Sequence, residues 1–158
     1  GLNDASEWVQ DKTGLGSSGV APLQKGERPN FPVPGTVGSG VGARINPVSH
    51  REGHHNGVDI AAAAGTPIKA PASGVVEKVD YQGDGAGHYV ILRHGDGTRS
   101  KYFHMQQQSP LKEGARISAG QVIGRVGSTG RSTGPHLHYE LWKDGRVLDP
   151  RRHKLRDT

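Results

Sequence analysis

The stretch Gly134-Pro135-His136-Leu137-His138-Tyr139-Glu140-Leu141 alternates polar and apolar side chains from His136 onward. This alternation is typical of a half-buried β-strand, because successive side chains point to opposite faces of a sheet. The strand would send its three apolar residues to the core and both histidines to the other face, toward a cleft. Residues two apart on a strand are about 7 Å apart, so one histidine could bind a metal while the other reaches the metal's water. By itself the pair is weak support, since two such histidines are often only solvated.

Short apolar runs at regular spacing surround this strand. They lie at residues 67–70, 74–79, 89–93, 98–104, 121–126 and 136–142, and turn-forming residues separate them. Asp96-Gly97 and Asp144-Gly145 each stand between two such runs and predict β-hairpins. No convincing helical period occurs after residue 31. The sequence therefore predicts an all-β fold with minor α content, a small antiparallel β-sheet or sandwich with a groove.

The N-terminal part differs from the rest of the chain. Residues 3–13 predict a short helix, with Asp4 as the N-cap and Gly14 as the stop. Residues 14–30 are rich in Gly, Ser and Pro without a period, which is typical of a linker or an extended arm. We therefore divide the chain into a helix and linker or arm at residues 1–30 and a folded domain at residues 31–158. The sequence leaves open whether the arm docks on the domain.

Composition narrows the chemistry. The 158 residues include no Cys and nine His, so disulfides and Cys-based metal sites are excluded, and any metal must be held by His, Asp or Glu. The net charge is +5, but the basic residues are scattered apart from Arg151-Arg152-His153-Lys154. Nucleic acid is not the expected partner, and an anionic polymer such as a bacterial cell wall fits this charge equally well. No apolar run approaches the roughly 18 residues of a membrane span.

A second histidine-rich stretch precedes the first apolar run. In His55-Asn56-Gly57-Val58-Asp59 a straight strand would hold His55 and Asp59 about 13 Å apart, so both can bind one ion only if the chain bends, as Gly57 permits. Together with His138 they would supply two imidazoles, one carboxylate and an open position. That is a catalytic zinc set, although the same set in facial geometry could hold iron. His54 competes with His55 for the ligand role.

Five separated elements in one order resemble the lysostaphin-like zinc peptidases of the M23 or LytM type. They are H-x-x-x-D at residues 55–59, Y-x-H at 102–104, the Gly127–Glu140 stretch, Gly65-Thr66-Pro67-Ile68, and Gly120-Gln121-Val122-Ile123-Gly124. The resemblance runs from about Gly42 to Pro150. It implies a small antiparallel sheet with a groove between loops, and a zinc endopeptidase that cuts peptide bonds in bacterial peptidoglycan. Residues 31–158 would then be the zinc metallopeptidase domain.

The resemblance also implies roles for individual residues. His55, Asp59 and His138 would bind Zn2+, and His104 and His136 would be the two catalytic histidines. His136 would transfer protons, and His104 would stabilise the oxyanion or share the proton transfers. A His with a pKa near 6.5 can take the proton of a metal-activated water and later protonate the leaving amine. Arg44 resembles an arginine that often precedes the first ligand in the family. Glu140 shares the face of the two histidines, and we expect it to support a ligand rather than to act as the base.

Two rival functions and several settings remain open. A module that keeps the fold but only binds peptidoglycan or activates other wall enzymes is the first rival. The second rival is a biotinyl or lipoyl carrier domain. The spacing of glycines and apolar residues at 112–124 resembles that of such carriers, but no lysine stands at the required hairpin tip. The chain is expected to act outside the cell, in the periplasm or in a phage virion. The start at Gly1-Leu2 favours a piece of a larger protein, such as a phage tail or envelope protein.

Overall fold

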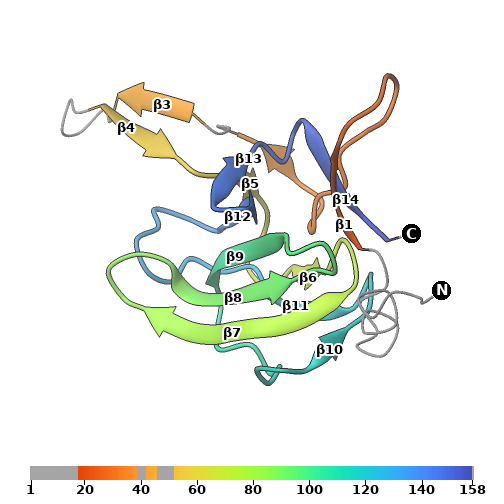
Figure 1. Ribbon diagram of the computed structural model, residues 1–158. Helices are drawn as coiled ribbons and strands as arrows, with labels where there is room; N and C mark the ends of the chain where they lie inside the picture. The colour runs from red at the N-terminus through yellow and green to blue at the C-terminus, as the bar shows by residue number, and fades with distance from the viewer. Residues whose placement is uncertain (1–17, 39–41, 46–51, 158) are drawn as a thin grey trace.

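The structure is a computed structural model that describes residues 18–38, 42–45 and 52–157, with the backbone alone at 42–45 and 52–55. All regular elements in these ranges are β-strands and all of their pairings are antiparallel (Figure 1), which confirms the predicted all-β fold. The helix predicted at residues 3–13 lies outside the described ranges. Within them no helix is long and apolar enough to cross a membrane.

One large sheet and three strand pairs make up the fold. In spatial order the large sheet contains β10 (Arg116–Ile117), β7 (Gly74–Gln82), β8 (Gly87–Arg93), β9 (Arg99–Met105), β12 (His136–Lys143), β5 (Val58–Ala61) and β2 (Thr36–Val37), and β13 (Arg146–Leu148) pairs with β12. The pairs are β1 (Gly19–Pro22) with β14 (His153–Arg156), β6 (Pro67–Lys69) with β11 (Val122–Arg125), and β3 (Gly42–Ile45) with β4 (Glu52–His55).

The apolar runs and turns of the sequence reappear as strands and hairpins. All six runs predicted from periodicity correspond to strands, namely β6, β7, β8, β9, β11 and β12. Asp96-Gly97 joins β8 to β9, and Asp144-Gly145 joins β12 to β13, each pair being antiparallel. The two hairpin predictions are therefore confirmed.

The core lies against one face of the large sheet. Leu137, Tyr139 and Leu141 of β12 are at most 1% exposed, as their alternation with polar residues predicts. The β6–β11 pair adds Ile68 and Ile123, both fully buried in the same cluster. Burial of such a side chain stabilises the fold by about 1.5–3 kcal/mol. This packing fixes which residues of β12 are left for the opposite face.

Gly57 brings β5 against β12. The chain bends at Gly57, between β4 and β5, where a bend was required to bring residues 55 and 59 together. A Cβ atom built on Gly57 would lie 2.2 Å from the backbone oxygen of Tyr139. Only glycine tolerates this approach, so Gly57 is needed for the close contact that puts Asp59 opposite His138.

The described part of the N-terminal arm docks on the domain. β1 pairs with β14 from Gly19 opposite Arg156 to Pro22 opposite His153, and Val20 packs against the core cluster. Farther along, Glu27 forms an ion pair with Arg156 at 2.9 Å. The arm therefore contributes to the folded structure from residue 18 onward, and the division at residue 31 stays a prediction.

Candidate metal and catalytic site

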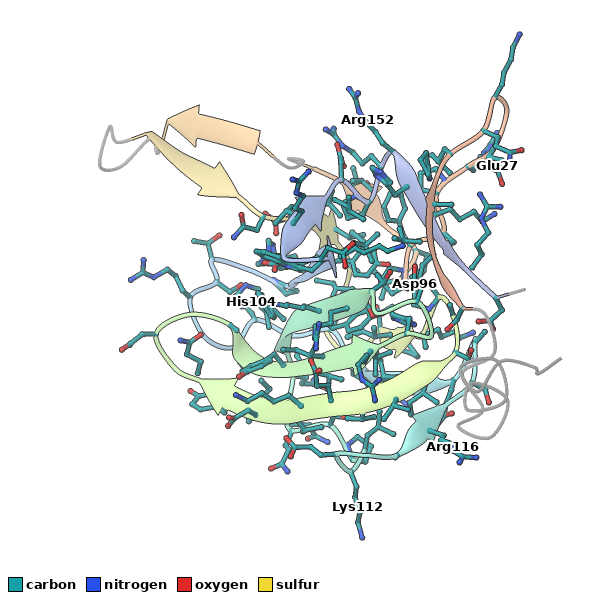
Figure 2. The ribbon with its side chains drawn as sticks, in the orientation of Figure 1. Glu27, Asp96, His104, Lys112, Arg116 and Arg152 are labelled. Atoms are coloured by element: carbon teal, nitrogen blue, oxygen red, sulfur yellow. The ribbon has the colours of Figure 1, made fainter. Side chains whose placement is uncertain are left out.

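A cleft of about 410 Å³ lies on the face of the large sheet opposite the core. The three neighbouring strands β5, β9 and β12 line it with Asp59, Phe103, His104, His136 and His138. Gln82 lines it from the end of β7, and Gly85, Ala86 and Arg131 line it from the adjoining loops. Figure 2 labels His104, which belongs to β9 of this sheet. Four of the five residues predicted for the site from sequence are thus brought together.

His55, the fifth predicted residue, is described only by its backbone. It ends β4, and Asn56 and Gly57 separate it from β5. The side chains of His55, of its competitor His54 and of Arg44 lie outside what the structure describes. Their predicted roles therefore stay predictions.

Asp59 and His138 face each other from adjacent strands. They are register partners of β5 and β12, and Asp59 Oδ1 is 2.8 Å from His138 Nδ1. Two ligand atoms about 2.0–2.2 Å from one tetrahedral ion lie about 3.3–3.6 Å from each other. The two atoms are in direct hydrogen-bond contact, closer than a shared ion would hold them, so they would move apart slightly to bind one ion. Among the residues whose side chains are described, no third His, Cys, Asp or Glu completes a group that could hold a metal.

Glu140 supports His138 from the other side of its ring. Its Oε2 atom is 2.8 Å from His138 Nε2, and its Oε1 accepts a 2.6 Å hydrogen bond from Trp142 Nε1. Burial lowers the pKa of the metal-free His138 imidazole, but hydrogen bonds to Asp59 and Glu140 outweigh this effect and raise it to about 9. Glu140 is 5% exposed and does not line the cleft. Its contacts fit a residue that orients a ligand, as the sequence suggested.

His136 presents one ring nitrogen to the site. Its Nδ1 atom lies 2.8 Å from the carbonyl oxygen of Gly134, to which it donates, and 3.3 Å from Ser132 Oγ. Because Nδ1 carries the proton, Nε2 has a free lone pair. His136 Nε2 lies 3.7 Å from Asp59 Oδ1, beside the two facing donor atoms. This geometry suits a proton acceptor next to a metal.

His104 reaches the cleft through a break in the strand pattern. Phe103 and His104 are neighbours in β9, so strict alternation would place them on opposite faces of the sheet, but both line the cleft. Phe103 is opposite His138 in the register, and the two rings stack at 5.2 Å. His104 has a φ of 67°, in the left-handed region, which rotates its side chain back onto the same face. Such a conformation costs about 1–3 kcal/mol and is found at functional sites.

The backbone of two loops holds His104 in this conformation. His104 N donates to the carbonyl oxygen of Ala86 at 2.7 Å, and Nδ1 donates to that of Thr129 at 2.8 Å. Burial lowers the pKa of His104, which favours the neutral imidazole, and in that form the Nδ1 bond leaves the lone pair on Nε2. Its ring centre is 4.8 Å from that of His136. Two imidazoles held in the same tautomer therefore stand side by side in the cleft.

Thr129 supports the site from a loop, and sequence reasoning gave it no role. Its hydroxyl donates to the carbonyl oxygen of Met105 at 2.6 Å and accepts from His88 N at 3.0 Å. These bonds fix the loop whose carbonyl holds His104. The next residue, Gly130, has a φ of 75°, and a Cβ there would lie 2.3 Å from Gly87 N. The Gly-rich spacing before the HLH strand was visible in the sequence, but the partners of Thr129 were not.

Comparison with known proteins places this site in a family. Residues 53–150 match the model of peptidase family M23. An uncharacterized metalloprotease of Haemophilus influenzae is 48% identical over 115 residues, which are 73% of this chain and 24% of that protein. The peptidoglycan DD-endopeptidase ShyC of Vibrio cholerae is 45% identical over 108 residues, 68% of this chain and 24% of that protein. A zinc-containing peptidase of Vibrio cholerae has a similar structure, with a TM-score of 0.73 and 33% identity over 80% of this chain and 40% of the other.

Proposed function

The chain belongs to peptidase family M23, and from this premise we propose that it is a zinc-dependent endopeptidase that hydrolyses peptide bonds in bacterial peptidoglycan. The observation that carries the proposal is the cleft that joins Asp59 and His138 to His104 and His136. The names of the relatives support the substrate class. The chain spans about a quarter of the length of the curated relatives it matches, so the activity is proposed for this domain.

We propose His55, Asp59 and His138 as the zinc ligands. Support comes from the separation of 2.8 Å between Asp59 Oδ1 and His138 Nδ1, and from the zinc-containing peptidase of similar structure. Two imidazoles and one carboxylate leave a coordination position open, as in catalytic zinc sites. When bound, the zinc ion would lower the pKa of its water toward about 7.

His104 and His136 are assigned to proton transfer. Each imidazole donates from Nδ1 to a loop carbonyl and turns Nε2 toward the cleft, so each can accept a proton there. A protonated imidazole can then deliver that proton to the leaving amine. The lowered pKa of His104 favours this role over stabilisation of an oxyanion, which would require a proton on Nε2. Glu140 holds His138 and Trp142 and is not assigned to the chemistry.

The setting of the reaction follows from its substrate. Peptidoglycan lies outside the cytoplasmic membrane, so the domain would act in the periplasm or outside the cell. A phage virion, within a larger tail or envelope protein, stays a prediction from sequence. The rival function, a module that binds the wall without cutting it, shares the fold and would differ in its products.

Digestion of purified peptidoglycan tests the proposal. Metal-free protein should release nothing, and protein with one zinc ion per chain should release fragments with new amino termini, identified by mass spectrometry. His138→Ala should lose most of its zinc and all detectable cleavage. A zinc-loaded wild-type protein that binds peptidoglycan but releases no fragment from walls of two chemotypes would establish the binding module instead.

A further inference from the structure

The face of the large sheet that carries the cleft continues beyond it. In an antiparallel sheet, register partners point to the same face, so rows of side chains can be read across strands. The row of the cleft contains Phe103, His138 and Asp59. The next row along β9 and β12 contains Ile91, Lys101 and Glu140, and the row after that contains Arg93, Arg99 and Trp142. The second and third rows lie about 7 and 14 Å from the cleft row.

This surface, here called the cationic ledge, carries the side chains of Arg93, Arg99, Lys101 and Trp142. Lys101 Nζ lies 4.6 Å from the centre of the Trp142 ring, which the lysine partly covers. Arg99 forms an ion pair of 2.7 Å with Glu77 at the outer side. Among the described residues, neither Arg93 nor Lys101 forms an ion pair.

The ledge has an excess of positive charge. Hydrogen bonding to Arg99, followed by the nearby charges of Arg93 and Lys101, lowers the pKa of Glu77, which shows that three cations surround one exposed carboxylate. The other carboxylate nearby, Glu140, is buried and hydrogen-bonded to His138 and Trp142. An anionic group bound beside Lys101 would therefore be close to positive charge that no carboxylate of the described residues neutralises.

Hydrogen bonds connect the ledge directly to the site. His138 is bound to Glu140, Glu140 to Trp142, and the Trp142 ring underlies Lys101. A ligand extended along β9 from the cleft would pass over Phe103 and reach Lys101. We propose that the cationic ledge binds carboxylates of an acidic peptide segment that adjoins the scissile bond, and so makes Lys101 and Arg93 determinants of substrate choice. This inference rests on the proposed function for the identity of the substrate.

An acidic peptide fits the ledge better than a nucleic acid. Binding of single strands uses uncovered aromatic rings on which bases stack. The two rings nearest the cations are already engaged, because Phe103 stacks on His138 and Lys101 lies over Trp142. Carboxylates need only the cations and a row spacing of about 7 Å.

Sedimentation with sacculi tests the ledge without catalysis. The metal-free protein is mixed with native sacculi and with sacculi whose carboxylates have been converted to carboxamides, and the bound fraction is measured. We expect native sacculi to bind better. Lys101→Met and Arg93→Gln should each reduce this preference by about 1.4- to 5-fold, the range for one exposed ion pair. Lys101→Arg should keep the preference.

Lys112→Met is the matched control, because it makes the same charge change elsewhere. Figure 2 shows Lys112 projecting from the molecule away from His104, and the residue is exposed. The inference is overturned if Lys112→Met loses as much preference as Lys101→Met, if the Lys101→Met/Arg93→Gln double variant keeps it, or if single-stranded DNA binds more tightly than native sacculi. Zinc-loaded protein that shows the preference but cuts no wall overturns the proposed function alone.

Discussion

At the scale of single residues, the site depends on which nitrogen of each imidazole is left free. His104 and His136 each donate a hydrogen bond of 2.8 Å from Nδ1 to a loop carbonyl, and both direct Nε2 into the cleft. The residue types were readable from the sequence, and so was the shared face of His136 and His138. The tautomers were not, because Thr129 and Gly134 act through backbone oxygens that any residue possesses.

The first prediction concerns these two histidines. His104→Ala and His136→Ala should keep zinc, because neither is among the proposed ligands, and should lose about 10²–10⁴-fold in turnover, the range for general acid–base catalysis. Zinc content by atomic spectroscopy and turnover on a soluble peptide would be measured on the same sample. A variant that retains near-normal turnover would show that its histidine is only a neighbour.

The second prediction concerns His94, a buried histidine outside the site. It is 1% exposed, with Nδ1 donating to the Ser73 carbonyl and Nε2 accepting from Ser100, each at 2.7 Å. Burial lowers the pKa of His94 below 6.5 despite opposing contributions from the Ser73 hydrogen bond and from Asp96 and Asp157. Below about pH 6.5, His94 therefore binds a proton more readily in the unfolded chain than in the folded chain. This contribution to stability is full above about pH 6.5 and is lost as the pH falls below it.

Denaturant unfolding between pH 7.5 and pH 5 checks this sign. The free energy of unfolding of the wild type should fall toward acid relative to that of His94→Gln, by at most about 1.4 kcal/mol per pH unit. His138, whose raised pKa changes stability in the opposite direction, is present in both proteins and does not affect this difference. His94→Gln should be less stable at pH 7.5, because the Ser73 and Ser100 contacts are disturbed, and this deficit should shrink toward pH 5. If the difference in free energy of unfolding between the two proteins is the same at pH 7.5 and pH 5, His94 does not contribute to the pH dependence of stability.

At the scale of elements, periodicity predicted the strands and hairpins but not the contacts that the loops make. The six apolar runs became strands and Asp96-Gly97 and Asp144-Gly145 became hairpins, because burial of one face imposes a period of two. The alternation was wrong at His104, where the loop contacts of Ala86 and Thr129 stabilise a φ of 67°. Such a contact joins residues far apart in sequence, so no local pattern reports it.

The third prediction tests the loop that holds His104. Thr129→Val removes the hydroxyl that bonds to Met105 and His88 while keeping a similar shape. The carbonyl that orients His104 should then shift, and a displacement of about 1 Å in a catalytic group can cost about 100-fold. We expect kcat to fall about 10- to 100-fold with KM nearly unchanged. Thr129→Ser keeps the hydroxyl and should stay close to the wild type.

A separate measurement distinguishes positioning from folding. The nuclear magnetic resonance signal of the His104 imidazole should move in Thr129→Val and return in Thr129→Ser, at a temperature where both variants are folded. If Thr129→Val melts lower but retains its kcat and the His104 signal, Thr129 serves stability alone.

At the scale of the whole molecule, the N-terminal arm is part of the structure from residue 18 onward. The sequence suggested a linker or arm because Gly, Ser and Pro dominate residues 14–30 and no period appears there. Composition alone did not show that a strand as short as β1 would pair with β14, since the partner lies more than 130 residues away. Val20 also donates its backbone N–H to Asp96 at 3.1 Å, which ties the arm to the β8–β9 turn.

The fourth prediction compares two truncations. Deletion of residues 1–24 removes β1, whereas deletion of residues 1–17 leaves it in place. We expect the longer deletion to melt roughly 5–10 °C below the shorter one, for a loss of about 1–3 kcal/mol in packing and pairing. Both should keep zinc and hydrolyse soluble peptides alike at 20 °C, because no residue of the cleft is removed. Equal melting temperatures would show that the strand pair contributes little.

The direction of the β1–β14 pair determines how the domain would respond to mechanical load. Gly19 lies opposite Arg156, so the two outgoing ends of the pair leave from the same end of the ladder. Tension applied through both flanks would therefore peel the strands apart one rung at a time, in a zipper geometry, instead of shearing all rungs together. Rupture would start at this pair and spare the cleft, whose strands β5, β9 and β12 lie deeper in the chain. Under such a load the arm would detach before the cleft is distorted.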